Sequence, residues 1–247
     1  MSAIAESLQP VLSKLEKRVN LSDEDRRAFL NLPFTRKDLG AGACLTREGD
    51  PARTCSAVLS GFAYRHKTIA NGARQIISVQ VVGDLLDVEN ALFGTATHSV
   101  QMMTSGSLAV IPAAVLEKVM AERPALQRAV WLSTLVDSSV FGEWIANVGR
   151  RDARARISHL LCELAVRLKA VGLLRSGTYD LPMTQEQIGD ATGLTAVHVN
   201  RTIQDLRRSG VISNDKRSVT VQNWRALTDI GGFDPAYLHE GTVAALS

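Results

Sequence analysis

The sequence has few of the residues that hold cofactors or covalent cross-links. Its 247 residues include only three cysteines, Cys44, Cys55 and Cys162, which are too few and too scattered for a disulfide framework, a four-cysteine zinc site or a four-cysteine iron–sulfur cluster. No uncharged apolar run approaches the roughly 18 residues of a membrane span, and the first residues lack the basic and apolar regions of a signal peptide. We therefore expect a cytoplasmic protein without a membrane span.

Basic residues are distributed unevenly along the chain. Residues 151–225 contain 12 Lys or Arg against 7 Asp or Glu, a net charge of +5, whereas residues 1–150 contain 16 against 15. A basic segment in a near-neutral chain favours a module that binds a polyanion, although an ordinary solvated face would also account for five charges. Hydrophobic residues make up 45% of the chain, enough for a folded core.

The first half of the chain changes from helical to strand-like patterns. Residues 6–31 have helical spacing of apolar residues, with Ser22 as an N-cap before a second helix. Asn71-Gly72 predicts a hairpin with a type I′ turn, in which both residues have positive φ. Short strands are predicted over 54–59, 62–69, 75–82, 98–103 and 107–111. Many short strands at regular spacing predict a small antiparallel roll.

A long helix is predicted from Pro124 to about Val148, after a short helix over 113–121. Its apolar residues extend beyond one narrow stripe, so it is expected to bury one face on the roll and another elsewhere. A second copy of the helix is the economical partner, and a monomeric core helix is the alternative. The residues expected in this dimer helix are Leu126, Val130, Val136, Val140, Trp144 and Val148.

Residues 184–204 predict a helix-turn-helix. Thr184 and Gln187 have the spacing of a capping box, and Gly193 falls where a three-residue turn requires positive φ. Thr195 caps a second helix that runs from about Ala196 to Ser209 and buries its apolar side. Residues 211–221 then predict the hairpin wing of a winged helix.

The second helix has polar and basic residues on its outer side. A helical hairpin that only packs in a core would not explain them, whereas base-edge and phosphate contacts would. The residues expected to contact DNA are Thr184, Gln185, Thr195, Ala196, Val197, His198, Asn200, Arg201, Gln204, Arg208, Lys216 and Arg217.

The order of these parts resembles the Crp/Fnr family of bacterial transcription regulators over nearly the whole chain. The segments that carry the resemblance are 47–50, 59–61, 71–75 and 83–84 in the roll, and 187–189, 193–195, 199–202 and 206–212 in the winged helix. The family implies an α+β fold with an N-terminal antiparallel, cyclic-nucleotide-binding-like β-roll, a long dimerisation helix and a C-terminal winged helix-turn-helix. It also implies a homodimer that binds a near-palindromic operator and is switched by a signal at the roll.

We expect four regions. They are residues 1–123 for the first helices and roll, 124–149 for the dimerisation helix, 150–224 for the DNA-binding domain and 225–247 for a C-terminal tail. RNA polymerase is a further possible partner.

The recognition helix departs from the family pattern at one position. Members often have an acidic residue two positions after the N-cap, where this chain has Val197. An apolar side chain suits a thymine methyl group better than cytosine, so the family's operator sequences do not transfer. Arg201 matches the family's base-reading arginine and is expected to contact guanine.

The roll departs from the cyclic-nucleotide-binding members. Those members use a Gly-Glu pair for the ribose and an Arg-Ser pair for the cyclic phosphate, and the corresponding pocket here is expected at Gly83, Asp84, His98, Ser99 and Phe141. No Lys or Arg occurs between Arg74 and Lys118. A buried phosphate without a cation is costly, so we expect cyclic AMP not to be the effector.

Other functions are weighed against these residues. Haem ligation by His66 or His98 and metal binding near Asp84 have little support, because single histidines and acidic turns are usually structural. The chain has no nucleophile–His–acid set and no phosphate loop, so we expect no enzyme. A metabolite- or haem-binding sensor module is the alternative to a DNA-binding regulator, ahead of a β-roll enzyme.

Overall fold

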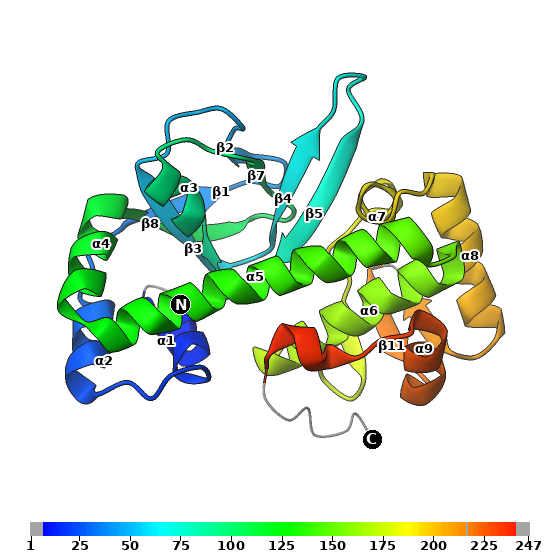
Figure 1. Ribbon diagram of the computed structural model, residues 1–247. Coiled ribbons are helices and arrows are strands. Elements are labelled where there is room, and N and C mark those ends of the chain that lie inside the picture. Colours follow the sequence, from blue (N-terminus) through cyan, green and yellow to red (C-terminus); the bar gives the residue numbers. More distant parts are fainter. Residues whose placement is uncertain (1–6, 216, 241–247) are drawn as a thin grey trace. The chain divides into compact units, whose positions relative to one another are not determined.

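The computed structural model describes residues 7–215 and 217–240, which form two compact units (Figure 1). Of these residues, the first unit comprises 7–67 and 79–138, and the second comprises 68–78, 139–215 and 217–240. Each unit is described separately below. Among the described residues, no helix has the length and apolar character needed to cross a membrane.

Two short helices, α1 (Gln9–Glu16) and α2 (Asp23–Leu30), begin the first unit. The Ser22 side chain caps α2 by accepting from the Asp25 backbone N–H, and the Asp25 carboxylate accepts from the Ser22 backbone N–H. This capping box fixes the start of α2. The apolar sides of both helices join a core cluster that includes Leu12, Phe29 and Ile111.

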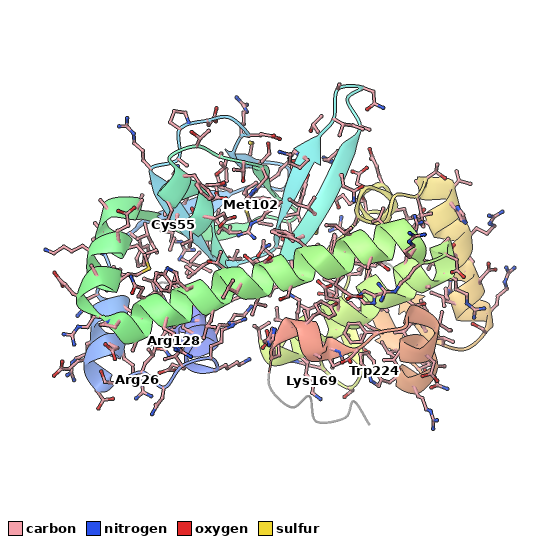
Figure 2. The ribbon with its side chains drawn as sticks, in the orientation of Figure 1. Arg26, Cys55, Met102, Arg128, Lys169 and Trp224 are labelled. Atoms are coloured by element: carbon pink, nitrogen blue, oxygen red, sulfur yellow. The ribbon has the colours of Figure 1, made fainter. Side chains whose placement is uncertain are left out.

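Two four-stranded antiparallel sheets form the roll, as the strand pattern predicts. Side chains from both sheets, including Val58, Val100 and Leu108, meet in a buried cluster between them. Cys55 and Met102, both labelled in Figure 2, are buried in the same unit. One sheet has the strand order β1 (Thr35–Leu39), β8 (Gly106–Pro112), β3 (Thr54–Ser60) and β6 (Leu85–Leu86). The other sheet has the strand order β2 (Cys44–Thr46), β7 (Ser99–Met102), β4 (Ala63–Thr68) and β5 (Arg74–Gln80).

The hairpin around Asn71-Gly72 forms, but its predicted type I′ turn is wrong. Gly72 has φ of 84°, whereas Asn71 is not among the described residues with positive φ. The Asn71 side chain instead accepts from the Ala73 backbone N–H at 2.9 Å, and the Ile69 N–H donates to the Ala73 carbonyl. A side-chain acceptor stabilises a longer loop here, so only the glycine needs the left-handed region.

Helices α3 (Val88–Phe93), α4 (Ala113–Glu122) and the 27-residue α5 (Pro124–Arg150) follow. The predicted short helix and long helix are therefore present, and the two units share α5. Pro124 begins α5, where a missing N–H costs no helical hydrogen bond. Helix α6 (Ala153–Ala170) starts only two residues after α5 ends, and the Asp152 side chain caps it.

The second unit contains the helix-turn-helix and a three-stranded sheet. Helices α7 (Gln185–Thr192) and α8 (Ala196–Arg208) precede the wing hairpin of β10 (Ile212–Asp215) and β11 (Ser218–Val221). A third strand, β9 (Thr178–Asp180), pairs with β11 and was not predicted. The region expected to be a tail contains helix α9 (Trp224–Gly231) and the 3-10 helix η2 (Pro235–Leu238).

The buried position of Phe29 gives a test of the first core. Phe29→Ala should lower the free energy of unfolding by about 3–5 kcal/mol, because the ring has no exposure and its removal leaves a cavity. Phe93→Ala makes the same chemical change at a position that is 76% exposed and should cost less than about 0.5 kcal/mol. Urea unfolding of the two variants checks this, and equal losses would contradict the core assignment.

Candidate nucleic-acid interface and the interior of the roll

The turn between α7 and α8 is built by local hydrogen bonds and one close backbone approach. The capping box at Thr184 and Gln187 is present, with bonds of 3.1 and 2.9 Å. Gly193 ends α7 with φ of 68°. A Cβ on Gly189 would lie 2.4 Å from the Leu194 carbonyl oxygen, so a glycine is needed where α7 meets the turn. The predicted helix-turn-helix is confirmed in detail.

Helix α8 has one buried side and one exposed side. Thr195 caps it by accepting from the His198 N–H at 3.2 Å. Val199 and Leu206 have no exposed surface, whereas Val197 on the other side is 81% exposed. The other exposed residues at the start and centre of the helix are Thr195, Ala196, Asn200 and Arg201. This arrangement places an apolar, an amide and a guanidinium group together on an open helix face.

The wing and the end of α8 add exposed basic groups. Arg217 is exposed at the hairpin turn, and Lys216 lies outside the described residues. Arg208 is exposed but forms an ion pair with Asp205 one turn back, and half-buried Gln204 accepts from Arg207 at 3.1 Å. Arg207 was missed as a candidate, although its type and position in the last helical turn could have identified it.

A buried arginine occupies the interior of the first unit. Arg65 of β4 is 1% exposed, and its Nη1 lies 2.7 Å from Oδ2 of Asp137 on α5. Its Nη2 lies 3.7 Å from Glu89 and 3.4 Å from the Leu85 carbonyl oxygen. Burial opposes the charge of Arg65, but Asp137 and Glu89 outweigh it and raise its pKa. Burial raises the pKa of Asp137 despite the Arg65 charge.

His98 joins this buried cluster. Its Nε2 lies 3.2 Å from Oδ1 of Asp87, which has left-handed backbone with φ of 62°. Asp87 also accepts from Thr46 Oγ1 at 2.7 Å and Asn90 Nδ2 at 2.9 Å. Burial would raise the pKa of Asp87, but the hydrogen bonds from His98 and Thr46 and the Arg65 charge lower it overall. These bonds hold a backbone conformation that is costly for a residue other than glycine.

Two residues of the predicted effector pocket have structural roles instead. Asp84 accepts from Lys14 Nζ of α1 at 2.6 Å and from the Val81 backbone N–H at 2.7 Å. A Cβ on Gly83 would lie 2.6 Å from the Pro10 carbonyl oxygen. The assignment of Gly83 and Asp84 to the pocket is therefore wrong, because α1 packs against their turn.

The remaining predicted pocket residues have different neighbours, each within its own unit. Ser99 accepts from the Glu48 backbone N–H at 3.0 Å. Phe141 belongs to the second unit, where it lines an apolar pocket of about 450 Å³ with residues that include Ile76, Trp144 and Val148. Within the first unit, His98 is the predicted pocket residue that contacts the Arg65 cluster, through Asp87 and Glu89.

The predicted absence of a cation from the roll interior is also wrong. The sequence stretch after Arg74 does lack cations, but Arg65 enters from the preceding strand. The recess beside it has a free volume of about 0 Å³, against the roughly 300–1,000 Å³ of small-molecule sites. It is lined by Leu85, Val88, Glu89, Val130, Ser133, Thr134 and Asp137. The cation present is already paired, so an incoming phosphate would meet excess carboxylate, and the residues do not fit a cyclic nucleotide.

The predicted dimer-helix residues face inward rather than toward a partner. Leu126 and Val130 belong to the core of the first unit. Val140 and Trp144 are 5% and 6% exposed, and Trp144 Nε1 donates to Glu163 of α6 at 2.8 Å. Val136 and Val148 are half-buried. The assignment is wrong for the four buried residues, which are used inside the chain, and it stays a prediction for Val136 and Val148.

The described parts of the chain contain no cluster of metal-binding side chains, and two of the three cysteines, Cys55 and Cys162, are buried. Within residues 7–215 and 217–240, no three His, Cys, Asp or Glu side chains are placed to hold a metal ion. Burial raises the pKa of the Cys55 thiol to about 12, so this cysteine is protonated and unreactive at neutral pH.

Known proteins share both parts of this architecture. Sequence models of the cyclic nucleotide-binding domain and of the Crp-like helix-turn-helix domain match residues 36–123 and 155–230. The transcriptional activator protein FnrL of Cereibacter sphaeroides is 29% identical over 216 residues, 86% of each chain. A probable transcriptional activator of Rhizobium leguminosarum bv. viciae is 28% identical over 183 residues, 74% of this chain and 75% of that one. The structure of FixK2 from Bradyrhizobium japonicum has a similar fold, with a TM-score of 0.75 at 24% identity, over 81% of this chain and 98% of that one.

A β-roll, a long helix and a winged helix with an open basic face define a DNA-binding transcription regulator, not an enzyme. The chain belongs to the Crp/Fnr family of transcription regulators.

The Arg65–Asp137 pair can be tested by removing one or both charges. Arg65→Met should destabilise the protein by about 3–5 kcal/mol, because it removes the buried cation on which half-buried Asp137 and Glu89 converge. The double variant Arg65→Met/Asp137→Leu should recover part of this loss. Arg36→Met is the matched control, since Arg36 pairs with exposed Asp38. This change should lower the free energy of unfolding by less than about 1 kcal/mol. Urea unfolding measures all three, and equal stability of the two single variants would contradict the buried pair.

Proposed function

We propose that the chain binds a near-palindromic operator as a homodimer, with one α8 helix of each copy in the major groove. The observation that carries this proposal is the open face of α8, where Val197, Asn200 and Arg201 are exposed opposite a fully buried side. Helices of this kind place their first residues against base edges. The proposal concerns a regulator of the cytoplasm.

The α8 residues have distinct proposed roles. Arg201 is suited to a bidentate contact with guanine, and Asn200 to hydrogen bonds with a neighbouring base. Val197 offers a methyl contact to thymine. Thr184, Gln185, His198, Arg208 and Arg217 would bind the phosphate backbone or support that contact, and Gln204 would reach a base from the next turn.

A stripe of exposed residues along α5 supports the homodimer. Its members alternate at spacings of three and four, which is the seam of a two-stranded coiled coil. Trp131, Leu135 and Ile145 are 53%, 61% and 74% exposed. The stripe consists of Arg128, Trp131, Leu135, Ser138, Gly142, Ile145 and Gly149, and Figure 2 labels Arg128 near its start.

Contact with RNA polymerase is part of this proposal. Two of the similar proteins are named as a transcriptional activator and a probable transcriptional activator. Activation by a bound regulator commonly requires a surface that meets the polymerase, so an activator role is favoured over repression.

The roll is proposed to work without a cyclic nucleotide. Arg65 is enclosed by Asp137, Glu89 and Asp87, and the adjoining recess is too small for a nucleotide. The larger pocket beside Phe141 is apolar except at Gln75, so a ligand accepted there would be neutral.

DNA binding should depend steeply on salt. Each neutralised phosphate contributes a slope of about −0.9 to the log–log salt plot, so several basic contacts per subunit give a steep decline. Arg201→Ala should lose about 1–3 kcal/mol of operator binding and relax preference at one base pair in each half-site. Arg36→Ala, a change in the first unit, is the control. Operators selected from a random duplex pool provide the probe, and a flat response between 50 and 200 mM salt would contradict the proposal.

The α5 stripe should be required for dimerisation. Leu135→Glu or Ile145→Glu would place a charge in an apolar seam and should yield folded monomers, because neither side chain belongs to the core. Phe93→Glu, at an equally exposed apolar position outside α5, should leave the dimer intact. Light scattering measures the mass, and an intact dimer after both α5 changes would exclude this seam.

Cyclic AMP and cyclic GMP should not switch the protein. Calorimetry with millimolar cyclic nucleotide should give no binding heat, and operator affinity should stay unchanged with the nucleotide present. Micromolar binding together with at least a tenfold gain in operator affinity would show that the Arg65 cluster opens to admit a phosphate.

A further inference from the structure

The joint between α5 and α6 is short. Arg150 ends α5, Ala153 begins α6, and only Arg151 and Asp152 lie between them. Helix α6 belongs to the DNA-binding domain and packs against α7 and α8. The angle between α5 and α6 therefore sets the orientation of α8 relative to α5. Two residues alone leave that angle free, unless other contacts span the joint.

A C-terminal segment, residues 231–238, supplies such contacts. It begins where the match to the Crp-like helix-turn-helix domain ends, at residue 230. A Cβ on Gly231 would lie 2.8 Å from the His159 backbone nitrogen, so the segment leaves α9 in direct contact with the backbone of α6. The Gly232 carbonyl oxygen accepts from Arg151 Nη2 at 3.2 Å, and the same Nη2 donates to Glu143 of α5 at 2.6 Å. Arg151 thus connects the segment to α5 at the joint.

The buried carboxylate of Glu163 also connects α5, α6 and the C-terminal segment. Glu163 of α6 has no exposed surface, and its Oε2 accepts from Trp144 Nε1 of α5 and from the Tyr237 hydroxyl of η2, both at 2.8 Å. Arg167 donates to its Oε1 at 3.3 Å. Burial and the Glu163 charge raise the pKa of Tyr237, so its hydroxyl remains a donor. Trp144 and Glu163 are buried and Tyr237 is half-buried, so leaving the Glu163 carboxylate without these donors is costly.

Aromatic packing fixes Tyr237 in place. Its ring stacks on His159 of α6 at 5.8 Å, and Phe233 packs edge-on against His159 at 5.1 Å. Phe233 also contacts Trp224, labelled in Figure 2 at the start of α9. Burial, together with Arg151, lowers the pKa of His159 and keeps the ring neutral at neutral pH. The segment is therefore a packed element that touches both helices of the joint.

We propose that the C-terminal segment, with Tyr237 as its positioning residue, holds α5 and α6 at the angle that operator binding requires. This inference rests on the proposed operator binding by a homodimer. Two recognition helices must lie about one DNA turn apart, roughly 34–36 Å, to contact both half-sites together. A loosened joint would weaken this simultaneous contact, whereas phosphate contacts of each winged helix with any duplex would remain.

The test compares affinity for a selected operator with affinity for a scrambled duplex of equal length. Tyr237→Phe removes only the hydroxyl, which donates to Glu163 of α6 and lies 3.1 Å from His159 Nε2 of the same helix, and should lower the ratio of the two affinities about five- to tenfold. Tyr179→Phe is the matched control, because this buried hydroxyl donates to the Leu161 carbonyl at 3.0 Å within the DNA-binding domain and does not contact α5. It should change the ratio less than twofold. Similar ratios for the two variants would overturn the proposal.

Two further variants keep the test decisive. In a chain ending at Gly232, the ratio of operator affinity to scrambled-duplex affinity should fall more than tenfold below wild type. In a chain ending at Glu240, this ratio should equal that of wild type. Trp144→Phe removes the α5 donor to Glu163, so combining it with Tyr237→Phe should cost less than the sum of the two single losses. Additive losses would overturn the shared role of Glu163.

A measurement without DNA separates this inference from the proposed function. Hydrogen exchange of the backbone amides of residues 151–156 should be faster in Tyr237→Phe than in wild type, and unchanged in Tyr179→Phe. Unchanged exchange in both variants would overturn the inference. Failure of the wild-type protein to discriminate operator from scrambled DNA would instead overturn the proposed function.

Discussion

The long helix α5 contributes side chains to both compact units, and the rest of the structure depends on how its faces are divided. Its inner face supplies Leu126 and Val130 to the first core and Trp144 to the second unit. Because those residues are used inside the chain, the outer stripe is left for a second copy. An apolar helix with more than one buried face must meet more than one partner surface. Here the surfaces are the two units and the proposed dimer seam.

Each unit contains a carboxylate that pairs with a buried side chain next to this helix: half-buried Asp137 in the first and buried Glu163 in the second. Asp137 of α5 faces a buried guanidinium in the roll, so the interior is charged but already neutralised in part. Glu163 of α6 faces two neutral donors and Arg167, and it joins helices on either side of the joint. Pairs and networks of this kind are costly to break, because removing one member leaves an unpaired buried charge. They therefore fix specific helix positions where apolar packing alone would allow several.

Sequence patterns predicted most of the secondary structure and the exposed face of α8. The capping box at Thr184, the turn at Gly193 and the exposed Arg201 were all identified correctly, because each depends on residues within about four positions along one chain segment. The same reasoning failed for the roll interior. It searched the cation-free stretch after Arg74, whereas Arg65 reaches the site from the neighbouring strand.

The sequence by itself determined the elements whose hydrogen bonds close locally: the helix caps, the place of the hairpin loop at Asn71-Gly72 though not its turn type, and the two-sided pattern of α8. Only the tertiary structure decided which face of α5 is buried, because its apolar residues are too numerous for a single stripe and periodicity cannot rank the faces. It also decided that Asp84 pairs with Lys14, 70 residues earlier, and that Tyr237 reaches Glu163, 74 residues earlier. Contacts over such separations depend on how whole elements pack, and no spacing rule within one segment contains that information.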